Sequence, residues 1–283
     1  MFSQGSRSEL RYIKETSYGV TPASPTLKRL PIKTHSLDLT KERLTGADIQ
    51  ADRMQRVDRH GNRSASGSIE VDLRKDDFDE FLESAFLSTF DTNDEITIGT
   101  TPSFFTLEDA ALDVSEFRLF KGMTVSTATF SIAPNQMVNT TFEMVGQTMT
   151  QNATTASTGG TPTGPTSVQP FDSYNGEIFE GGTGTSDELG IVTSLEFSIT
   201  NSFAPTFVIG SDFAPHLEYG MAVVEGTLTC YYEDSTLIDR FLAETETELQ
   251  VEVDVPGGTA PYIFYMPRIK YNGASVPLAN PQS

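Results

Sequence analysis

The sequence predicts a mainly β protein made of two similar halves, each with several antiparallel strands and one short helix that covers a sheet face. Three observations support this fold class. Apolar and polar residues alternate with period 2 in many segments, which is typical of half-buried strands. Helical periodicity is found in two short segments. A pattern of strand, acidic turn and helix occurs twice, and an uncharged stretch separates the two copies.

The repeated pattern is the clearest sign of two related halves. Residues 65–86 read ASGSIEVDLRKDDFDEFLESAF, and residues 224–244 read VEGTLTCYYEDSTLIDRFLAE. A glycine opens each copy, at Gly67 and Gly226, and alternating apolar residues, acids and a helical Phe-Leu pair follow. The match needs one inserted residue. The Phe-Leu pairs are expected to anchor each helix on its sheet and are Phe81, Leu82, Phe241 and Leu242.

Strand patterns cover most of both halves. In ELQVEVDV (248–255), the apolar residues share one face and the acids the other, as in an antiparallel sheet with one open side. The predicted strands lie in 36–40, 68–73, 117–132, 138–146, 194–200, 220–232, 248–255 and 262–271.

Two helices are predicted, one in each half. The first begins near Asp76 and Asp77, which suit an N-cap. The second begins at 234–236, where Thr236 and Asp239 have the spacing of a capping box. The apolar stripe of the first helix has the i, i+3, i+4, i+7 spacing of one helical face and consists of Phe78, Phe81, Leu82 and Ala85.

Three further segments define the expected organisation. Residues 151–170 are uncharged and rich in Thr, Gly, Ser and Pro, so they are not expected to order by burying apolar surface. They predict a linker between domains at 1–150 and 171–283. The segments 44–65 and 204–220 are expected to be long loops without secondary structure of their own, and such loops are usually functional.

The charge distribution limits the possible partners. The chain of 283 residues has a net charge of -20, of which residues 151–283 carry -14. Residues 28–63 form a basic exception with a net charge of +4. An acidic surface repels nucleic-acid phosphate at long range. The charge therefore predicts either simple solubility or a surface that stays close to DNA without holding it.

Signals for catalysis or for a cofactor are absent from the sequence. The one cysteine, Cys230, excludes internal disulfides and metal sites built from several cysteines. The three histidines are far apart, and the DTNDE stretch (91–95) lacks the glycine and the final glutamate of a calcium loop. No stretch approaches the roughly 20 apolar residues that span a membrane. We therefore expect neither an enzyme, nor a cofactor, nor a membrane protein.

The order of the motifs resembles that of the major tail tube proteins of long-tailed, siphovirus-type bacteriophages. The resemblance is carried by LKRLPIKTHSLDLTKERLTGADIQADRMQRVDRHGNRSASGSIEVDL (27–73) and the acidic helix after it. RSELRYIKETSYGVTP (7–22), the second copy of the repeat and MPRIKYNG (266–273) contribute too. It extends over nearly the whole chain, and residues 90–112 and 150–190 match least.

The resemblance implies a β-sandwich or barrel-like domain in each half and a structural role in the virion. Tail tube domains form six-fold rings that stack into the tube through which phage DNA is ejected. A chain with two such domains would form pseudo-hexameric rings of three chains, with a hexamer as the alternative. Tape measure, tail tip and tail terminator proteins are the implied partners. The protein would occupy the host cytoplasm before assembly.

Two sets of residues are candidates for these roles. Acids on polar strand faces could line the lumen and keep DNA from sticking, or could simply face the outer solvent. The lumen candidates are Glu70, Asp72, Glu196, Glu252 and Asp254. The candidates for contacts between rings or subunits are Arg43, Arg53, Arg56, Arg59 and Arg63. The alternative function is a virion decoration or adhesin module that binds carbohydrate. Such a module commonly uses exposed tryptophan, which this chain lacks.

Overall fold

The computed structural model describes residues 5–47, 54, 57–181, 189, 192–255, 257–258 and 261–276. The chain divides into two compact units. Unit 1 consists of Met1–Phe130, Thr140–Val168 and Ser198–Glu225, and unit 2 of Ser131–Asn139, Gln169–Phe197 and Gly226–Ser283. These units interleave along the chain, so their limits differ from those predicted for consecutive domains. The tandem organisation stays a prediction.

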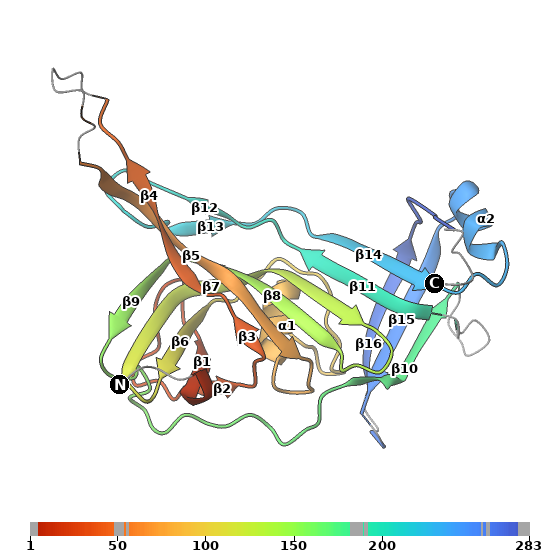
Figure 1. The fold of residues 1–283 in the computed structure, drawn as a ribbon, viewed down its shortest axis with the longest axis horizontal. Coiled ribbons are helices and arrows are strands. Elements are labelled where there is room, and N and C mark those ends of the chain that lie inside the picture. The colour runs from red at the N-terminus through yellow and green to blue at the C-terminus, as the bar shows by residue number, and fades with distance from the viewer. Residues whose placement is uncertain are drawn as a thin grey trace. The chain divides into compact units, whose positions relative to one another are not determined.

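Unit 1 contains a curled sheet and one helix (Figure 1). Its elements are the 3-10 turn η1 (Gly5–Arg7), β1 (Ser8–Lys14), β2 (Lys28–Leu30), β3 (Thr34–His35), β4 (Asp38–Leu44), β5 (Arg59–Asp72), α1 (Asp79–Phe86), β6 (Phe105–Ala111), β7 (Glu116–Ile132), β8 (Asn139–Gly146), β9 (Thr148–Asn152), β12 (Ala204–Thr206) and β13 (His216–Glu218). β11 (Val192–Thr200) ends in unit 1, and β14 (Val223–Cys230) begins there.

The curl of this sheet follows from its strand order. The main path is β2-β1-β6-β7-β8-β5-β3. β2 pairs with β1 at one end, where Leu30 lies opposite Leu10, and β3 pairs with β5 at the other, where His35 lies opposite Ile69. Only residues 31–33 connect β2 to β3. Since so short a connection joins the two ends, the sheet must bend round toward itself.

Helix α1 forms the centre of the core of unit 1. Phe81 stacks on Phe105 of β6 with ring centroids 4.9 Å apart, and it meets Tyr12 of β1 and Phe142 of β8 at 5.1 and 5.5 Å. Phe81 and Leu82 are 1% and 3% exposed. The helical stripe seen in the sequence therefore contacts rings from three strands of the curled sheet.

The start of α1 differs from the predicted one. Phe78 occupies the N-cap without a side-chain hydrogen bond, so the prediction of Asp76 or Asp77 as a cap is wrong. The Asp77 carboxylate instead accepts a hydrogen bond from the backbone N–H of Thr166, at 2.8 Å. Asp77 therefore binds a backbone N–H that is distant in the sequence, and not one in the first turn of α1. The residue preferences of helix starts do not predict such a distant partner.

The stretch predicted as a linker is ordered on unit 1. The hydroxyl of Thr155 and the backbone N–H of Ala156 donate to the carboxylate of Glu108, which is 1% exposed. Further along, the backbone N–H of Thr163 donates to the carbonyl of Leu27 at 2.9 Å. The prediction that residues 151–170 do not order is therefore wrong, because hydrogen bonds to the sheet fix a segment that buries little apolar area.

Unit 2 is built on a three-stranded sheet, β10-β15-β16. Its elements are β10 (Asp172–Glu180), α2 (Thr236–Leu242), β15 (Thr247–Asp254) and β16 (Tyr262–Ile269), together with parts of β11 and β14. Leu249, Val251 and Val253 form the buried face of β15, as the alternation predicts. The pairing order of the sheet matches that of β1-β6-β7 in unit 1. In both cases four described strands and a helix lie along the chain between the first two strands of the sheet.

The two glycines that open the repeat have the same steric role. A Cβ on Gly67, in β5, would lie 2.5 Å from the carbonyl oxygen of Ser36. A Cβ on Gly226, in β14, would lie 2.8 Å from the carbonyl oxygen of Glu196. Each glycine therefore allows a close approach of another segment's backbone, which a side chain would prevent.

Helix α2 is not anchored in the way that the repeat predicts. None of its residues is buried, Phe241 is half-buried, and Leu242 is 70% exposed. The prediction of Leu242 as a core anchor is wrong, because no curled sheet encloses α2 within the described part of unit 2. The guanidinium of Arg240 holds the helix instead, through an ion pair with Glu180 and a hydrogen bond to Thr247.

The cap of α2 is one residue earlier than predicted. Ser235 is the N-cap, and its hydroxyl donates to the carboxylate of Asp239 at 2.8 Å. The Asp234 carboxylate accepts a hydrogen bond from the N–H of Thr236. The segment thus satisfies donors at the helix start locally, although the predicted Thr236–Asp239 capping box does not form.

Candidate assembly surfaces

The two segments predicted to be loops form hairpins in unit 1. β4 extends to Leu44 and β5 begins at Arg59, so both ends of the first segment belong to paired strands. β12 and β13 pair within the second segment, where Pro205 lies opposite Leu217. The prediction that these segments lack secondary structure is wrong. The strand ends in the first hairpin are polar and alternate little, and β12 and β13 have only three residues each. Figure 1 shows the two hairpins extending in the same direction from the sheet.

Arg63 joins the two hairpins. Its backbone N–H donates to the carbonyl of Asp212 at 2.8 Å, and its guanidinium lies 3.3 Å from the Asp212 carboxylate. The guanidinium also lies over the ring of Phe213, 5.7 Å from the ring centroid. These three contacts hold the hairpins as one body. We call the described residues 38–47, 57–63 and 204–218 the arm.

The arginines predicted to contact neighbours have different surroundings. Arg43 forms an ion pair with Asp58 across the first hairpin, and this pair lowers the pKa of the Asp58 carboxyl. Arg59 is exposed at the start of β5. Arg53 and Arg56 lie outside the described residues. The set is therefore not uniformly available for a neighbour, because Arg43 and Arg63 already bind acids of their own unit.

The arm also carries exposed apolar side chains that the sequence analysis did not identify. Leu44 and Val57 stand near the end of the first hairpin, and Val57 is 94% exposed. Val208 and Ile209 occupy the turn of the second hairpin, and Ile209 is fully exposed. A detectable signal existed, since these apolar residues occur inside predicted loops, where burial by the local fold is not expected.

Two of the edge strands, β14 and β16, combine an unpaired edge with exposed apolar side chains. β14 pairs only with β11, and β16 pairs only with β15, among the strands that the structure describes. Val223 and Val224 of β14 are each 42% exposed, and Ile263 and Tyr265 of β16 are about half exposed. An edge that combines open backbone groups with apolar side chains is a template for pairing with another chain.

The acids predicted to line a lumen fall into three environments. Glu70 and Asp72 lie 3.2 and 3.5 Å from the ammonium of Lys33, and the hydrogen bond that this ammonium donates to Glu70 is the main cause of a raised pKa of that lysine. Glu196 is exposed on β11. Glu252 and Asp254 are half-buried on β15, and Glu252 accepts a hydrogen bond from Gln250. The structure does not bring these five acids into one cluster within a unit.

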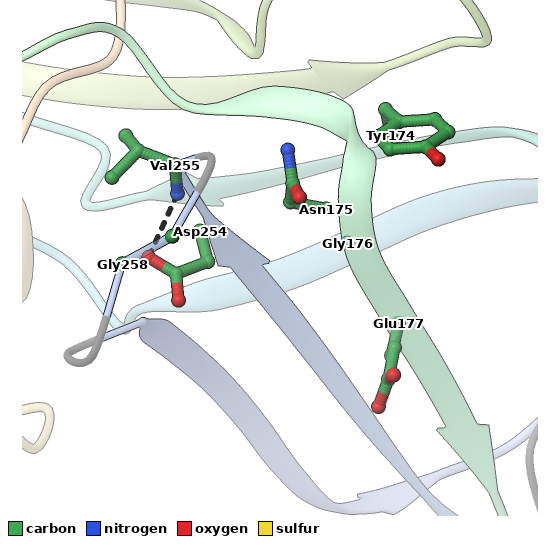
Figure 2. Close-up of a pocket in the computed structure, with 8 residues that line it drawn as sticks. Tyr174, Asn175, Gly176, Glu177, Asp254, Val255 and Gly258 are labelled. Atoms are coloured by element: carbon green, nitrogen blue, oxygen red, sulfur yellow. Dashed lines mark hydrogen bonds between the residues drawn. The ribbon is translucent and has the colours of Figure 1, made fainter.

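An open hollow of about 440 Å³ is found in unit 2, at the ends of β10 and β15 (Figure 2). Asp254 accepts a hydrogen bond from the N–H of Val255 there, and Glu177 of β10 also lines the hollow. Within the described residues, no group of three or more His, Cys, Asp or Glu residues could hold a metal ion. No helix among them is long and apolar enough to cross a membrane.

Comparison with known proteins agrees with a structural role. No curated protein matches this sequence. A solved structure, the tail of an empty GTA particle with C6 symmetry, is 11% identical with a TM-score of 0.37, and the match covers 53% of this chain and 99% of that chain. The family model described as phage tail tube protein matches residues 5–283. The chain therefore belongs to the phage tail tube protein family, and it is a structural subunit that assembles with its own copies into the tube of a phage tail.

Proposed function

We propose that three copies of this chain form a pseudo-hexameric ring, and that stacked rings form the channel through which phage DNA leaves the particle. Each copy supplies two similar sheets to the ring. The copies stay in the host cytoplasm until the tail assembles, and the finished tube meets tape measure, tail tip and tail terminator proteins. The repeated order of strand, helix and hairpin in the two units supports two ring positions for each chain.

The observation that carries this proposal is the pair of open edges on β14 and β16. Their counterparts in unit 1 are β5 and β7, and β8 lies between these and pairs with both. The described residues of unit 2 contain no strand in the place of β8. A strand from a neighbouring copy would supply the missing backbone partners, as in β-strand addition. Sheets joined in this way close into a ring without exposed edges.

The polar strand faces suit the wall of a DNA channel. Glu196 is the strongest candidate for the lumen, because it is exposed and lies between the buried Leu195 and Phe197 on β11. Glu70 and Asp72 share Lys33, so this group repels phosphate less than two free carboxylates would. Glu252 and Asp254 remain secondary candidates. A channel wall with few unpaired cations makes few contacts with DNA phosphates. Little binding free energy is then gained from counterion release, and the DNA slides without sticking.

The arm is proposed to contact a neighbouring ring or subunit. Its exposed apolar residues and the exposed Arg59 support a contact that is partly hydrophobic and partly ionic. Single exposed ion pairs contribute only about 0 to 1 kcal/mol. The contact therefore depends on several weak interactions that are repeated around the ring, and the ionic part weakens with salt.

Electron microscopy of the purified protein tests the proposal. The wild-type protein should form rings or hollow tubes, whereas a decoration or adhesin module would remain as dispersed particles. Val224→Lys places a charge beside the open edge of β14 and should block tube formation without lowering the melting temperature. Val20→Lys is the matched control, because Val20 is 51% exposed and is distant in the sequence from both β14 and β16. Normal tubes from Val224→Lys would overturn the role of this edge.

A further inference from the structure

The residues between β14 and α2, together with α2 itself, have exposed apolar side chains in the single chain. We call residues 231–242 the α2 segment. Tyr231, Tyr232 and Leu242 are 72%, 62% and 70% exposed, and no residue of α2 is buried. In unit 1, the equivalent Phe-Leu pair of α1 is almost completely buried. The apolar residues of the repeated strand-and-helix pattern are therefore buried in unit 1 and exposed in unit 2.

The α2 segment is held in place by polar contacts, although its apolar side chains are exposed. The ion pair between Arg240 and the buried Glu180 fixes the middle of the helix. The bonds of Ser235 and Asp234 fix its start. An exposed apolar patch on a fixed element is typical of a contact surface, because nothing has to be ordered when a partner binds.

The charges of the α2 segment indicate what kind of surface would cover it. It carries three carboxylates, on Glu233, Asp234 and Asp239, and none of them forms an ion pair with a described lysine or arginine. A partner surface should therefore offer apolar side chains together with cations.

The arm offers both. In the basic stretch 28–63, five of the described cations are paired with acids of their own chain: Lys28, Arg29, Lys33, Arg43 and Arg63. Lys41 and Arg59 are exposed and form no ion pair with any residue that the structure describes. These two cations stand on the arm beside the exposed Leu44 and Val57.

We infer that the arm of one copy docks on the α2 segment of a second copy of this chain. Leu44 and Val57 cover Tyr231, Tyr232 and Leu242, while Lys41 and Arg59 meet the carboxylates of the α2 segment. The contact joins two different surfaces, so it can repeat from copy to copy, as a growing tube requires. This inference rests on the proposed assembly and deepens it, because it names the surface that receives the arm.

A charge exchange tests the ionic part of the contact. Lys41→Glu with Arg59→Glu places five carboxylates and no partner cation in the contact. The concentration needed for tube growth at low salt should rise by roughly tenfold, which corresponds to about 1.4 kcal/mol for each contact. Adding Glu233→Lys to the same chain should restore part of that growth. Asp234 and Asp239 are left unchanged because their hydrogen bonds fix the start of α2. Glu95→Lys with Lys75→Glu is the matched control and should leave growth unchanged.

The outcomes separate this inference from the proposed function. If the Lys41→Glu, Arg59→Glu variant forms tubes as readily as wild type, or if the exchanged chain is no better than that variant, the docking is overturned while the tube function stands. If wild-type protein forms neither rings nor tubes, the proposed function itself fails.

A cross-linking experiment tests the contact directly. The chain with Cys230→Ser, Val57→Cys and Tyr232→Cys carries one new thiol on each surface. Oxidation of its tubes should give a ladder of covalent oligomers on a non-reducing gel, because each copy can bond to the next. Each single-thiol chain, in the same Cys230→Ser background, should give no ladder. Only monomers from the two-thiol chain, or a bond within one copy, would overturn the inference.

Discussion

The contrast between the two helices gives the sharpest stability prediction. Phe81→Ala removes a ring that is 1% exposed and that contacts Phe105, Tyr12 and Phe142. Removing a buried Phe costs about 3 to 5 kcal/mol. At about 2 to 4 °C for each kcal/mol, we expect the melting temperature of unassembled protein to fall by roughly 6 to 20 °C.

Phe241→Ala should act differently, although the repeat makes the two positions equivalent. Phe241 is half-buried on a helix without buried residues, so its truncation should cost about 1 kcal/mol, near half of the transfer free energy of a buried Phe. Differential scanning calorimetry of both variants, below the concentration at which tubes form, is the assay. A Phe81→Ala shift within about 2 °C of wild type, or equal shifts for the two variants, would refute this reasoning.

Three further substitutions test local features of the fold. Asp109 is half-buried, which raises its pKa, but bonds from His35 and Arg118 outweigh this burial and hold the pKa below its usual value. Its contribution to stability is therefore present at neutral pH and lost as pH falls below about 4, and Asp109→Asn should flatten this acid limb in melts taken between pH 3 and 7. Glu108→Gln breaks the buried pair with Arg11 and should cost about 3 to 5 kcal/mol, with faster proteolysis in residues 151–170; unchanged cleavage would contradict the role of Glu108 in holding that segment. Gly67→Ala should destabilise by about 1 to 3 kcal/mol because of its φ of 150° and the contact with Ser36, while Gly164→Ala, which has open space, should be neutral in denaturant titrations.

The regular parts of the fold could be predicted because local patterns determine them. The alternation in 248–255 matches β15, and the stripe through Phe81 matches α1. Both patterns reflect burial on one face, which is a property of neighbouring residues in the sequence.

The remainder depends on contacts between residues that are distant in the sequence. Glu108 orders the segment around Thr155, from 47 residues away, and composition alone cannot reveal such a partner. Leu82 and Leu242 occupy the same place in the repeat, yet one is buried and the other is exposed. The sequence shows that both belong to an apolar helix face, but which surface covers that face is decided by tertiary structure and, by our inference, by a second copy.

The ring is the central claim, and averaged cross-sections of wild-type tubes in electron micrographs test it most directly. The account predicts an open channel surrounded by six similar densities with three-fold symmetry, which correspond to three chains with two sheets each. Six chains in a ring, each with one sheet at the channel, would contradict it.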